Sequence, residues 1–209
     1  MAISMLQIPV GEGQANAYLV WQEGKQEAFI VDPGDEYLKL SGILKEKQLS
    51  LTAILLTHGH YDHIGAADAL RESTGAKIYA MKEEEKTLEE PEWNRSAFHS
   101  AGYGLKADIF LRDKEILTLA GISIQVIYTP GHTAGGCCYY LEEEGILFSG
   151  DTLFHTSIGR SDFFGGNGDM LIRSIKEKLL CLPENTKVYP GHMEATDIHT
   201  EKVFNPYLG

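Results

Sequence analysis

Short apolar runs separated by glycine-rich breaks fill the beginning of the chain, and this pattern is typical of β-strands joined by tight turns. Residues 32–35 (Asp-Pro-Gly-Asp) place proline and glycine where a type II turn favours them. Residues 36–48 then predict a helix with Leu38, Ile43 and Leu44 on or near one face. Before this turn, strands are predicted over 5–10, 16–21 and 27–31.

The alternation of strands and helices continues to the end of the chain. A β-type run at 52–56 leads into a polar, histidine-rich segment, and the charged segment 82–90 favours a solvated helix that Pro91 ends. Strand-rich halves that each carry helices favour an α+β fold with two mixed sheets packed together, although periodicity by itself leaves α/β open. Further strands are predicted over 77–80, 116–119, 122–128, 137–141, 146–148 and 187–189, and further helices over 64–73, 170–180 and 196–204.

Length and composition narrow the class of protein. A chain of 209 residues is long enough to bury a sizeable core and predicts one domain over residues 1–209. No apolar run reaches the ~18–20 residues of a membrane helix, and the start has no basic segment followed by an apolar block. The three cysteines lack zinc-knuckle spacing and predict reduced thiols. These features favour a cytoplasmic protein without membrane contact, and the net charge of −12 argues against nucleic acid as the main partner.

Three of the 8 histidines lie close together in the segment 57–63, which follows a predicted strand. In an extended chain, residues two apart point the same way and lie ~6–7 Å apart, so His58 and His60 are placed to converge on one metal ion. Asp62 and His63 are adjacent, so they point differently and suit a second metal beside the first. Imidazole and carboxylate ligands together suit zinc, iron or manganese.

The rest of the chain repeats one arrangement three times: an apolar strand, a glycine turn and then one metal-competent side chain. His132, Asp151 and His192 occupy this last position, and any one of them alone is better explained as a turn or surface residue. Strand ends are rigid, and the glycine lets each loop turn towards a shared centre. Together with the cluster, the three therefore predict one site of five histidines and two aspartates. No ligand role is predicted for His99, His155 and His199.

The combined motif resembles the metallo-β-lactamase superfamily over nearly the whole chain and in the right order. The resemblance implies a four-layer αβ/βα sandwich in which two mixed β-sheets pack face to face, with helices outside and the metals at one edge. It implies that the first metal is held by His58, His60 and His132. It implies that the second is held by Asp62, His63 and His192, with Asp151 bridging both.

Other segments are similar to the glyoxalase II-like hydrolases of this superfamily. β-Lactamases of the fold usually carry arginine where His63 stands and lack an aspartate at the position of Asp151. Relative to full-length glyoxalase II, the chain is expected to lack the C-terminal helical domain, and Glu194 stands where that family has a glutathione-contacting tyrosine. Arg160 matches a basic glutathione-contacting position, and a structural pair with Asp162 explains it equally well. The similar segments are 91–94, 129–133, 150–154, 157–162 and 205–208.

The resemblance implies a hydrolase with two divalent metal ions, zinc first and iron or manganese next, that cleaves a small-molecule thioester of the hydroxyacylglutathione type. A metal-bound hydroxide is expected to attack the carbonyl, so that no serine or cysteine nucleophile is needed. Asp62 is expected to orient this hydroxide and take its proton, and Asp32 and Thr133 to orient imidazole ligands. Two alternatives stay open: an iron-dependent persulfide dioxygenase, and a lactonase with the same ligands and a different pocket.

Overall fold

The computed structural model describes residues 2–209, which form two six-stranded sheets and a small two-stranded one. The first large sheet has the spatial order β1 (Ile3–Val10), β2 (Ala15–Gln22), β3 (Glu27–Val31), β4 (Ser50–Leu55), β5 (Lys77–Met81) and β6 (Ile109–Leu111). The second has the order β14 (Thr196–Asp197), β13 (Lys187–Pro190), β10 (Ile146–Gly150), β9 (Cys137–Leu141), β8 (Ile122–Tyr128) and β7 (Ile116–Leu119). A hairpin of β11 (Leu153–Phe154) and β12 (Ser157–Ile158) forms the small sheet.

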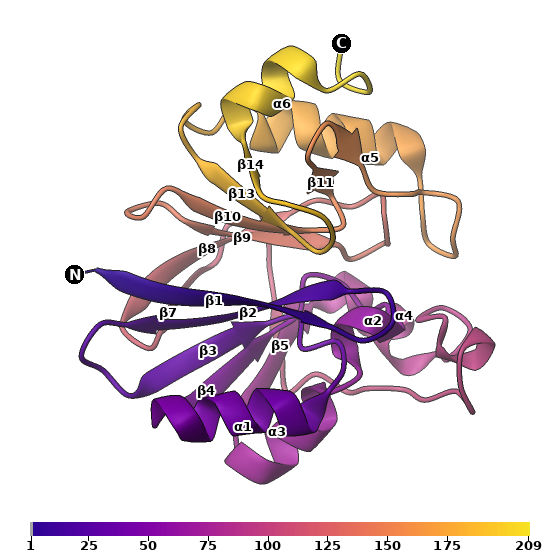
Figure 1. The fold of residues 1–209 in the computed structure, drawn as a ribbon. Coiled ribbons are helices and arrows are strands. Elements are labelled where there is room, and N and C mark those ends of the chain that lie inside the picture. The colour runs from indigo at the N-terminus through magenta and orange to yellow at the C-terminus, as the bar shows by residue number, and fades with distance from the viewer. Residues whose placement is uncertain (1) are drawn as a thin grey trace.

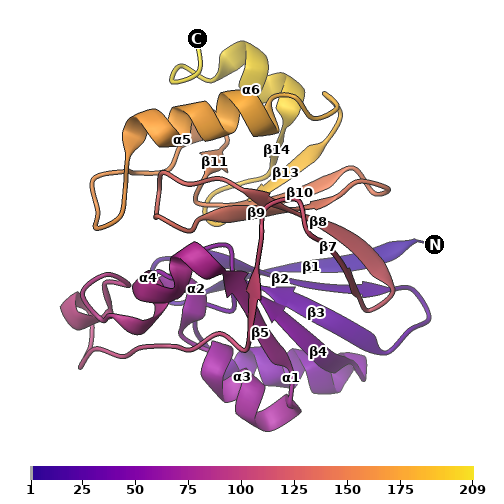
Figure 2. The same cartoon turned by 180° about the vertical axis from the view of Figure 1, so that it is seen from behind.

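The two large sheets face each other, and helices cover the outer face of each (Figure 1). On the first sheet lie α1 (Tyr37–Lys47) and α3 (Ala67–Thr74). On the second lie α5 (Gly168–Ser174), continued by the π-helical turn η3 (Ile175–Leu179), and α6 (Ile198–Phe204). The view from behind shows the same four layers (Figure 2). The predicted αβ/βα sandwich of two mixed sheets is therefore confirmed, since both sheets combine parallel and antiparallel pairs.

Alternation along the strands explains the layers. Tyr18 and Phe29 point from the first sheet into the space between the sheets, where Tyr139 and Phe148 meet them from the second. Their neighbours along the strands point to the opposite face and pack under α1 and α3; examples are Leu19, Ala28 and Ile30. Each large buried aromatic of this kind contributes about 3–5 kcal/mol against truncation to alanine. Three clusters thus fill the spaces between the four layers.

Several predicted helices differ from the structure at their ends. The predicted helix 64–73 is two helices, α2 (Tyr61–Ile64) and α3, because the chain turns at Gly65, where a side chain would clash with the carbonyl oxygen of Gly34. The helix predicted from residue 196 begins at Ile198, because residues 196–197 pair with β13 and the Asp197 side chain caps the helix by accepting from the Thr200 amide. The helix predicted over 170–180 begins earlier, at Gly168.

Two predictions about exposure are wrong. Leu38 does not lie on the buried face of α1, because its side chain is 81% exposed. Leu44 is buried as predicted, and Leu40 is buried in place of Leu38. The charged segment 82–90 forms η1 (Lys82–Glu84) and α4 (Glu85–Glu89), but it is not a uniformly solvated face, since Glu84 is only 1% exposed. The remaining short helix is η2 (Ser96–Phe98).

Among residues 2–209, no helix combines the length and the apolar character that crossing a bilayer requires. The cysteines are free thiols, as the sequence predicts: Cys137 and Cys138 are buried in the second sheet and Cys181 is exposed. Burial raises the pKa of the Cys138 thiol to about 11, which keeps it protonated and unreactive.

Candidate metal centre

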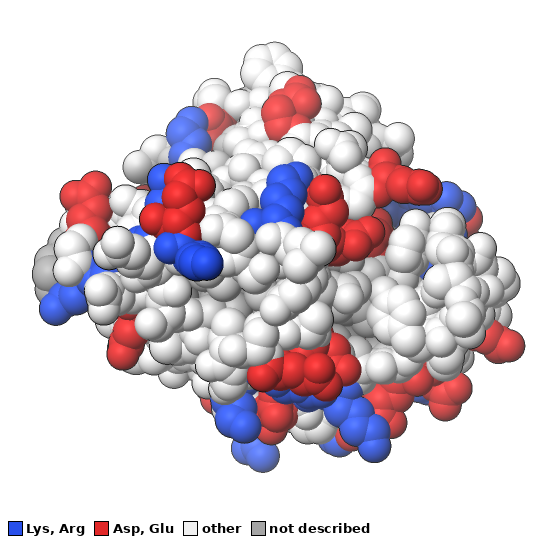
Figure 3. All heavy atoms as spheres, turned by 60° about the horizontal axis from the view of Figure 1, so that its bottom comes forward, with Lys and Arg blue, Asp and Glu red and all other residues white. Residues whose placement is uncertain are grey.

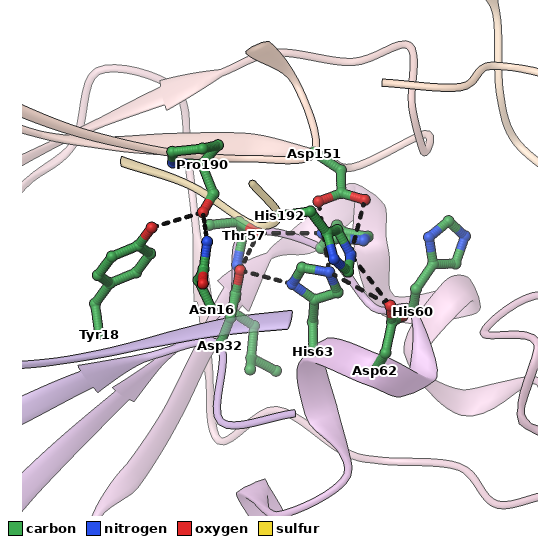
Figure 4. A network of polar contacts seen from close by, with 12 residues as sticks. Asn16, Tyr18, Asp32, Thr57, His60, Asp62, His63, Asp151, Pro190 and His192 are labelled. Carbon is green, nitrogen blue, oxygen red and sulfur yellow. Dashed lines mark hydrogen bonds and ion pairs between the residues drawn. The ribbon is translucent and has the colours of Figure 1, made fainter. Parts of the chain in front are cut away.

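The structure brings all seven predicted ligands together at the ends of four strands. Figure 4 labels His60, Asp62, His63, Asp151 and His192 among them. The segment after β4, in the first sheet, supplies His58, His60, Asp62 and His63, the last two from the first turn of α2. The second sheet supplies one residue after each of three strands: His132 after β8, Asp151 after β10 and His192 after β13. The centre therefore lies where the two sheets meet, and each sheet holds part of it.

The first group of ligands consists of three buried histidines. One nitrogen from each of His58, His60 and His132 lies within 4.8 Å of the others. The closest pair is His132 Nε2 and His60 Nδ1, at 2.9 Å. Burial lowers the pKa of all three rings below the ordinary value, with the neighbouring rings adding to the effect at His58 and His60. The rings are therefore neutral, which is the form that binds a metal ion.

Asp62, His63 and His192 form a second group of the same size. Asp62 Oδ2 lies 3.3 Å from His192 Nε2 and 3.9 Å from His63 Nε2. Asp151 faces both groups: its Oδ1 is 3.5 Å from His63 Nε2, and its Oδ2 is 3.6 Å from His132 Nε2 and 3.7 Å from His192 Nε2. One carboxylate thus stands between two sets of three ligands, which is the arrangement that two neighbouring metal ions need.

Unsatisfied buried atoms test whether these residues fit metal ions. His58 Nε2, His63 Nε2 and Asp151 Oδ1 are buried, and none has a hydrogen-bond partner among residues 2–209. Such atoms are costly unless a ligand satisfies them. Burial alone would lower the pKa of His63, but the carboxylates of Asp151, Asp62 and Asp32 raise it to about 10. Positive charge is therefore favoured at His63 Nε2, and a divalent cation bound there would supply it and satisfy the other atoms.

Asp32 fixes the orientation of two ligand rings. Its Oδ2 accepts a hydrogen bond from His63 Nδ1 at 3.0 Å and another from the Thr57 hydroxyl at 2.6 Å. Because the Thr57 hydroxyl donates to Asp32, its oxygen accepts from His58 Nδ1, 3.1 Å away. Asp32 Oδ1 accepts from the Thr57 amide. Asp32, His58 and His63 also lie close enough together to hold a metal ion. The hydrogen bonds above occupy both oxygens of Asp32, so its role is to orient the two histidine rings.

Glu84 links the two loops that carry the first group of ligands. Its Oε1 accepts from the Gly59 amide at 2.8 Å, and its Oε2 accepts from the Thr133 hydroxyl at 2.9 Å and the Gly135 amide at 2.7 Å. The prediction that Thr133 orients an imidazole is therefore wrong, because its hydroxyl is directed at a carboxylate that the charge pattern had placed on the surface. Burial raises the pKa of Glu84 to about 7, against these hydrogen bonds, which lower it.

Two further ligands are held by backbone contacts. His132 Nδ1 donates to the carbonyl oxygen of Arg160 at 2.6 Å, which leaves Nε2 to face the centre. The loop of His192 is held from β2, where Tyr18 and Asn16 both donate to the carbonyl oxygen of Pro190 (Figure 4). A side chain at Gly191 would overlap Asp151 Oδ1, so only glycine lets this loop approach. Sequence patterns did not point to these residues of β2, since they are far from the ligands along the chain.

Arg160, the predicted substrate-contacting residue, and Glu194, which stands where the family has a glutathione-contacting tyrosine, lie beside the loops of His132 and His192. Arg160 directs Nε and Nη2 at the two carboxylate oxygens of Asp162, at 3.0 and 2.8 Å. Glu194 accepts from His155 Nδ1 at 2.8 Å, and its side chain is 73% exposed. Both side chains thus pair with a neighbour at the surface, in contrast to the buried partners of the predicted ligands.

Comparison with known proteins agrees with this geometry. The family model described as the metallo-beta-lactamase superfamily matches residues 10–192. The chain is 40% identical to the hydroxyacylglutathione hydrolase GloC of Haemophilus influenzae over 210 residues, which covers 96% of each. It is 42% identical to the crystal structure of the B3 metallo-beta-lactamase BLEG-1, with a TM-score of 0.93 and coverage of 98% of this chain and 99% of that one. The structure of TTHA1623 in a di-iron-bound form gives a TM-score of 0.87 at 35% identity, with coverage of 97% and 100%.

Proposed function

The chain belongs to the metallo-β-lactamase superfamily, and we propose that it is a dinuclear metal hydrolase whose substrates are thioesters of the hydroxyacylglutathione type. The position of Asp151 carries this proposal, because its two oxygens face two separate groups of three ligands. The similarity to GloC, which is named a hydroxyacylglutathione hydrolase, supports the substrate class. Zinc is the first candidate from the ligand types, and the di-iron form of TTHA1623 makes iron the second.

The surface charge supports a small-molecule substrate. The chain carries a net charge of −12. On the face shown in Figure 3, basic side chains stand singly or in small groups among acidic ones. Recognition of nucleic acid relies on a continuous basic surface, which this face does not offer.

Two divalent cations in the centre would supply Lewis-acid polarisation of a carbonyl and a bound water whose pKa is lowered towards 7. Asp62 is the residue proposed to orient the attacking water and accept its proton. Burial would raise the pKa of Asp62, but His63 and His192 hold it well below its ordinary value, so the carboxylate is ionised. A thiolate is a good leaving group, so the chain needs no strong acid on the other side of the scissile bond.

β-Lactam hydrolysis is the second candidate function, because BLEG-1 is named a B3 metallo-β-lactamase and is similar over its whole length. His63 and Asp151 favour thioester hydrolysis over β-lactam hydrolysis. β-Lactamases of the fold usually have arginine at the position of His63 and no bridging aspartate at the position of Asp151. We therefore expect thioester cleavage to exceed β-lactam cleavage. A lactonase and a persulfide dioxygenase stay open as further alternatives.

The test combines an activity panel with elemental analysis of protein purified without chelator. The panel contains S-D-lactoylglutathione, a second thioester, a lactone, a chromogenic β-lactam and glutathione persulfide. We expect thioester hydrolysis to be fastest, to disappear after chelation and to return with zinc or iron, at about two metal ions per chain. A stoichiometry near one that added zinc, iron or manganese leaves unchanged would contradict the dinuclear centre, and faster β-lactam turnover would select the second candidate.

A further inference from the structure

The ring of Phe163 connects the metal centre to two cationic side chains. Its centroid lies 5.5 Å from the ring of His60 and 6.3 Å from that of His132, both edge-on. The guanidinium carbon of Arg95 lies 3.8 Å from the centroid of Phe163, and that of Arg160 lies 4.3 Å from it. Stacking on an aromatic ring holds a guanidinium in place and leaves its edge N–H groups available. Only the ring of Phe163 therefore separates the two arginine side chains from His60 and His132 of the first group of ligands.

The two arginines differ in whether their charge is compensated. Arg160 already makes two hydrogen bonds to Asp162, and both side chains are about two-thirds exposed. Arg95 is partly buried, and within residues 2–209 no carboxylate lies at ion-pair distance from it and no group accepts a hydrogen bond from its guanidinium. Arg95 thus offers a complete set of N–H donors beside the centre, while those of Arg160 are partly used.

The backbone of Arg95 is held in an unusual conformation by its neighbours. Its φ of 70° is in the left-handed region, which a residue with a side chain rarely adopts. Buried Asn94 and Ser96 on either side fix it, since Asn94 Nδ2 donates to the carbonyl oxygen of Tyr103 at 2.7 Å and the Ser96 amide donates to Asn94 Oδ1 at 2.8 Å. The Tyr61 amide, between two predicted ligands, donates to the Asn94 carbonyl at 2.8 Å. These contacts therefore fix the position from which the Arg95 side chain extends.

Arg95 lies on the wall of a cavity of about 290 Å³ beside the centre. Three phenylalanines supply the apolar part of this wall. Asp162 is compensated by Arg160, and Glu92 is exposed and beyond ion-pair distance from Arg95. The cavity therefore suits a ligand with an apolar or flexible chain and one anionic group. Its lining is Glu92, Arg95, Phe98, Asp162, Phe163 and Phe164.

We propose that Arg95 binds a carboxylate of the substrate in this cavity, so that the enzyme prefers thioesters whose thiol half carries a carboxylate away from the reacting carbonyl. This inference rests on the proposed function and deepens it. It moves the anion-binding role from Arg160, to which the family resemblance assigned it, to a residue without a carboxylate at ion-pair distance. A bidentate contact between guanidinium and carboxylate is strong and directional, and it orients the substrate as well as attracting it.

Steady-state kinetics on zinc-loaded protein tests the inference by comparing two thioesters, one with an anionic thiol half and one with an uncharged thiol half. The substrates are S-D-lactoylglutathione and the lactoyl thioester of N-acetylcysteamine. We expect Arg95→Ala to raise KM about ten- to a hundredfold for the first substrate only, because a contact to a charged group is lost. Arg95→Lys keeps the positive charge but cannot make two parallel hydrogen bonds to a carboxylate, so its KM for this substrate should lie between those of the wild type and Arg95→Ala. Arg173→Ala, at an exposed position of α5, is the matched control for the change in charge and should alter neither KM.

A binding measurement separates failure of this inference from failure of the proposed function. Calorimetry with S-methylglutathione, a thioether that cannot be hydrolysed, reports anion binding without turnover. We expect Arg95→Ala to weaken this binding about ten- to a hundredfold and Arg173→Ala to leave it unchanged. Loss of turnover on both thioesters in the wild type, with binding still dependent on Arg95, would reject the reaction and keep the site. Equal KM effects on both substrates, an effect at Arg160 but not at Arg95, or wild-type binding by Arg95→Ala would overturn the inference.

Discussion

The metal centre has two sides that are built in opposite ways. The inner wall, defined as Asp32, Thr57 and Glu84, is buried, and each of its carboxylate oxygens accepts at least one hydrogen bond from a ligand residue or a loop that carries ligands. The mouth is defined as Arg95, Phe163 and the pairs Arg160–Asp162 and His155–Glu194, and its residues are partly buried or exposed.

This difference separates two tasks of the molecule. Buried polar groups are expensive to leave without partners, so the inner wall permits few substitutions and keeps the ligand rings in one orientation. Exposed ion pairs contribute little to stability, so residues of the mouth are able to change with the substrate at little cost to the fold. The reaction is thus determined on the inside, and the choice of substrate on the outside.

The largest effect is expected at the ligands between the two sides. Asp62→Ala and His58→Ala should each lower kcat by at least ~10²–10⁴-fold, which is the usual cost of losing a general base alone, while the chain stays folded. Both side chains face the centre rather than the cores between the layers. Turnover, elemental analysis and circular dichroism measure this together. Near-normal turnover by either variant with metal still bound would remove the proposed mechanism.

Glu84 on the inner wall should make stability depend on pH. Its folded pKa of about 7 is above the ordinary 4.5, so it stabilises the fold fully below pH 4.5 and loses this contribution as the pH rises to 7. Relative to Glu84→Gln, the wild type should lose on the order of 3 kcal/mol of unfolding free energy over this window.

Urea unfolding of both proteins at pH 4.5, 6 and 7.5, at one zinc concentration, measures this difference. A difference that stays constant with pH would mean that the hydrogen bonds from Gly59, Thr133 and Gly135 keep Glu84 ionised throughout. The inner wall would then hold a permanent negative charge close to the metals.

Asp32→Asn should weaken metal binding by about ten- to a hundredfold, because the amide is a poorer acceptor for the His63 ring and the Thr57 hydroxyl. Competition with a chromophoric chelator measures the affinity. Asp162→Asn removes a carboxylate from the mouth and serves as the comparison, with metal affinity expected to stay within twofold of the wild type. Equal losses in the two variants would erase the distinction between inner wall and mouth.

The smallest effects are expected at the exposed pairs of the mouth. Arg160→Ala should raise the KM for S-D-lactoylglutathione and Glu194→Tyr should lower it, each by no more than about fivefold, since exposed ion pairs contribute ~0.2–1 kcal/mol. KM rises when Arg160→Ala removes a positive charge that attracts the anionic substrate, and it falls when Glu194→Tyr removes a negative charge that repels it. A tenfold or larger effect at Arg160 would show that its contact with Asp162 opens when substrate binds.

The same contrast explains what the sequence could predict. The predicted ligands are recognisable from local patterns: four form one cluster directly after a strand, and His132, Asp151 and His192 each follow a strand and a glycine turn. The partners of the ligands are not local: Glu84 lies in a charged helical run, and only the folded chain brings the amides of Gly59 and Gly135 to it. The predictions for Thr133 and Leu38 are wrong for this reason, since the surroundings of a side chain depend on the layer that packs against it. The left-handed backbone of Arg95 likewise has no sequence signature.

The division of the ligands between the two sheets has a mechanical consequence. His58, His60, Asp62 and His63 extend from the first sheet, and the other three extend from the second. Cations that fill the centre therefore act as a cross-link between halves of the chain that are distant in sequence. Pulling the sheets apart requires the cross-link to break first, so occupancy should slow global unfolding more than it stiffens any single loop. The protein would then resist proteolysis and heat more strongly as the concentration of free metal ion around it rises.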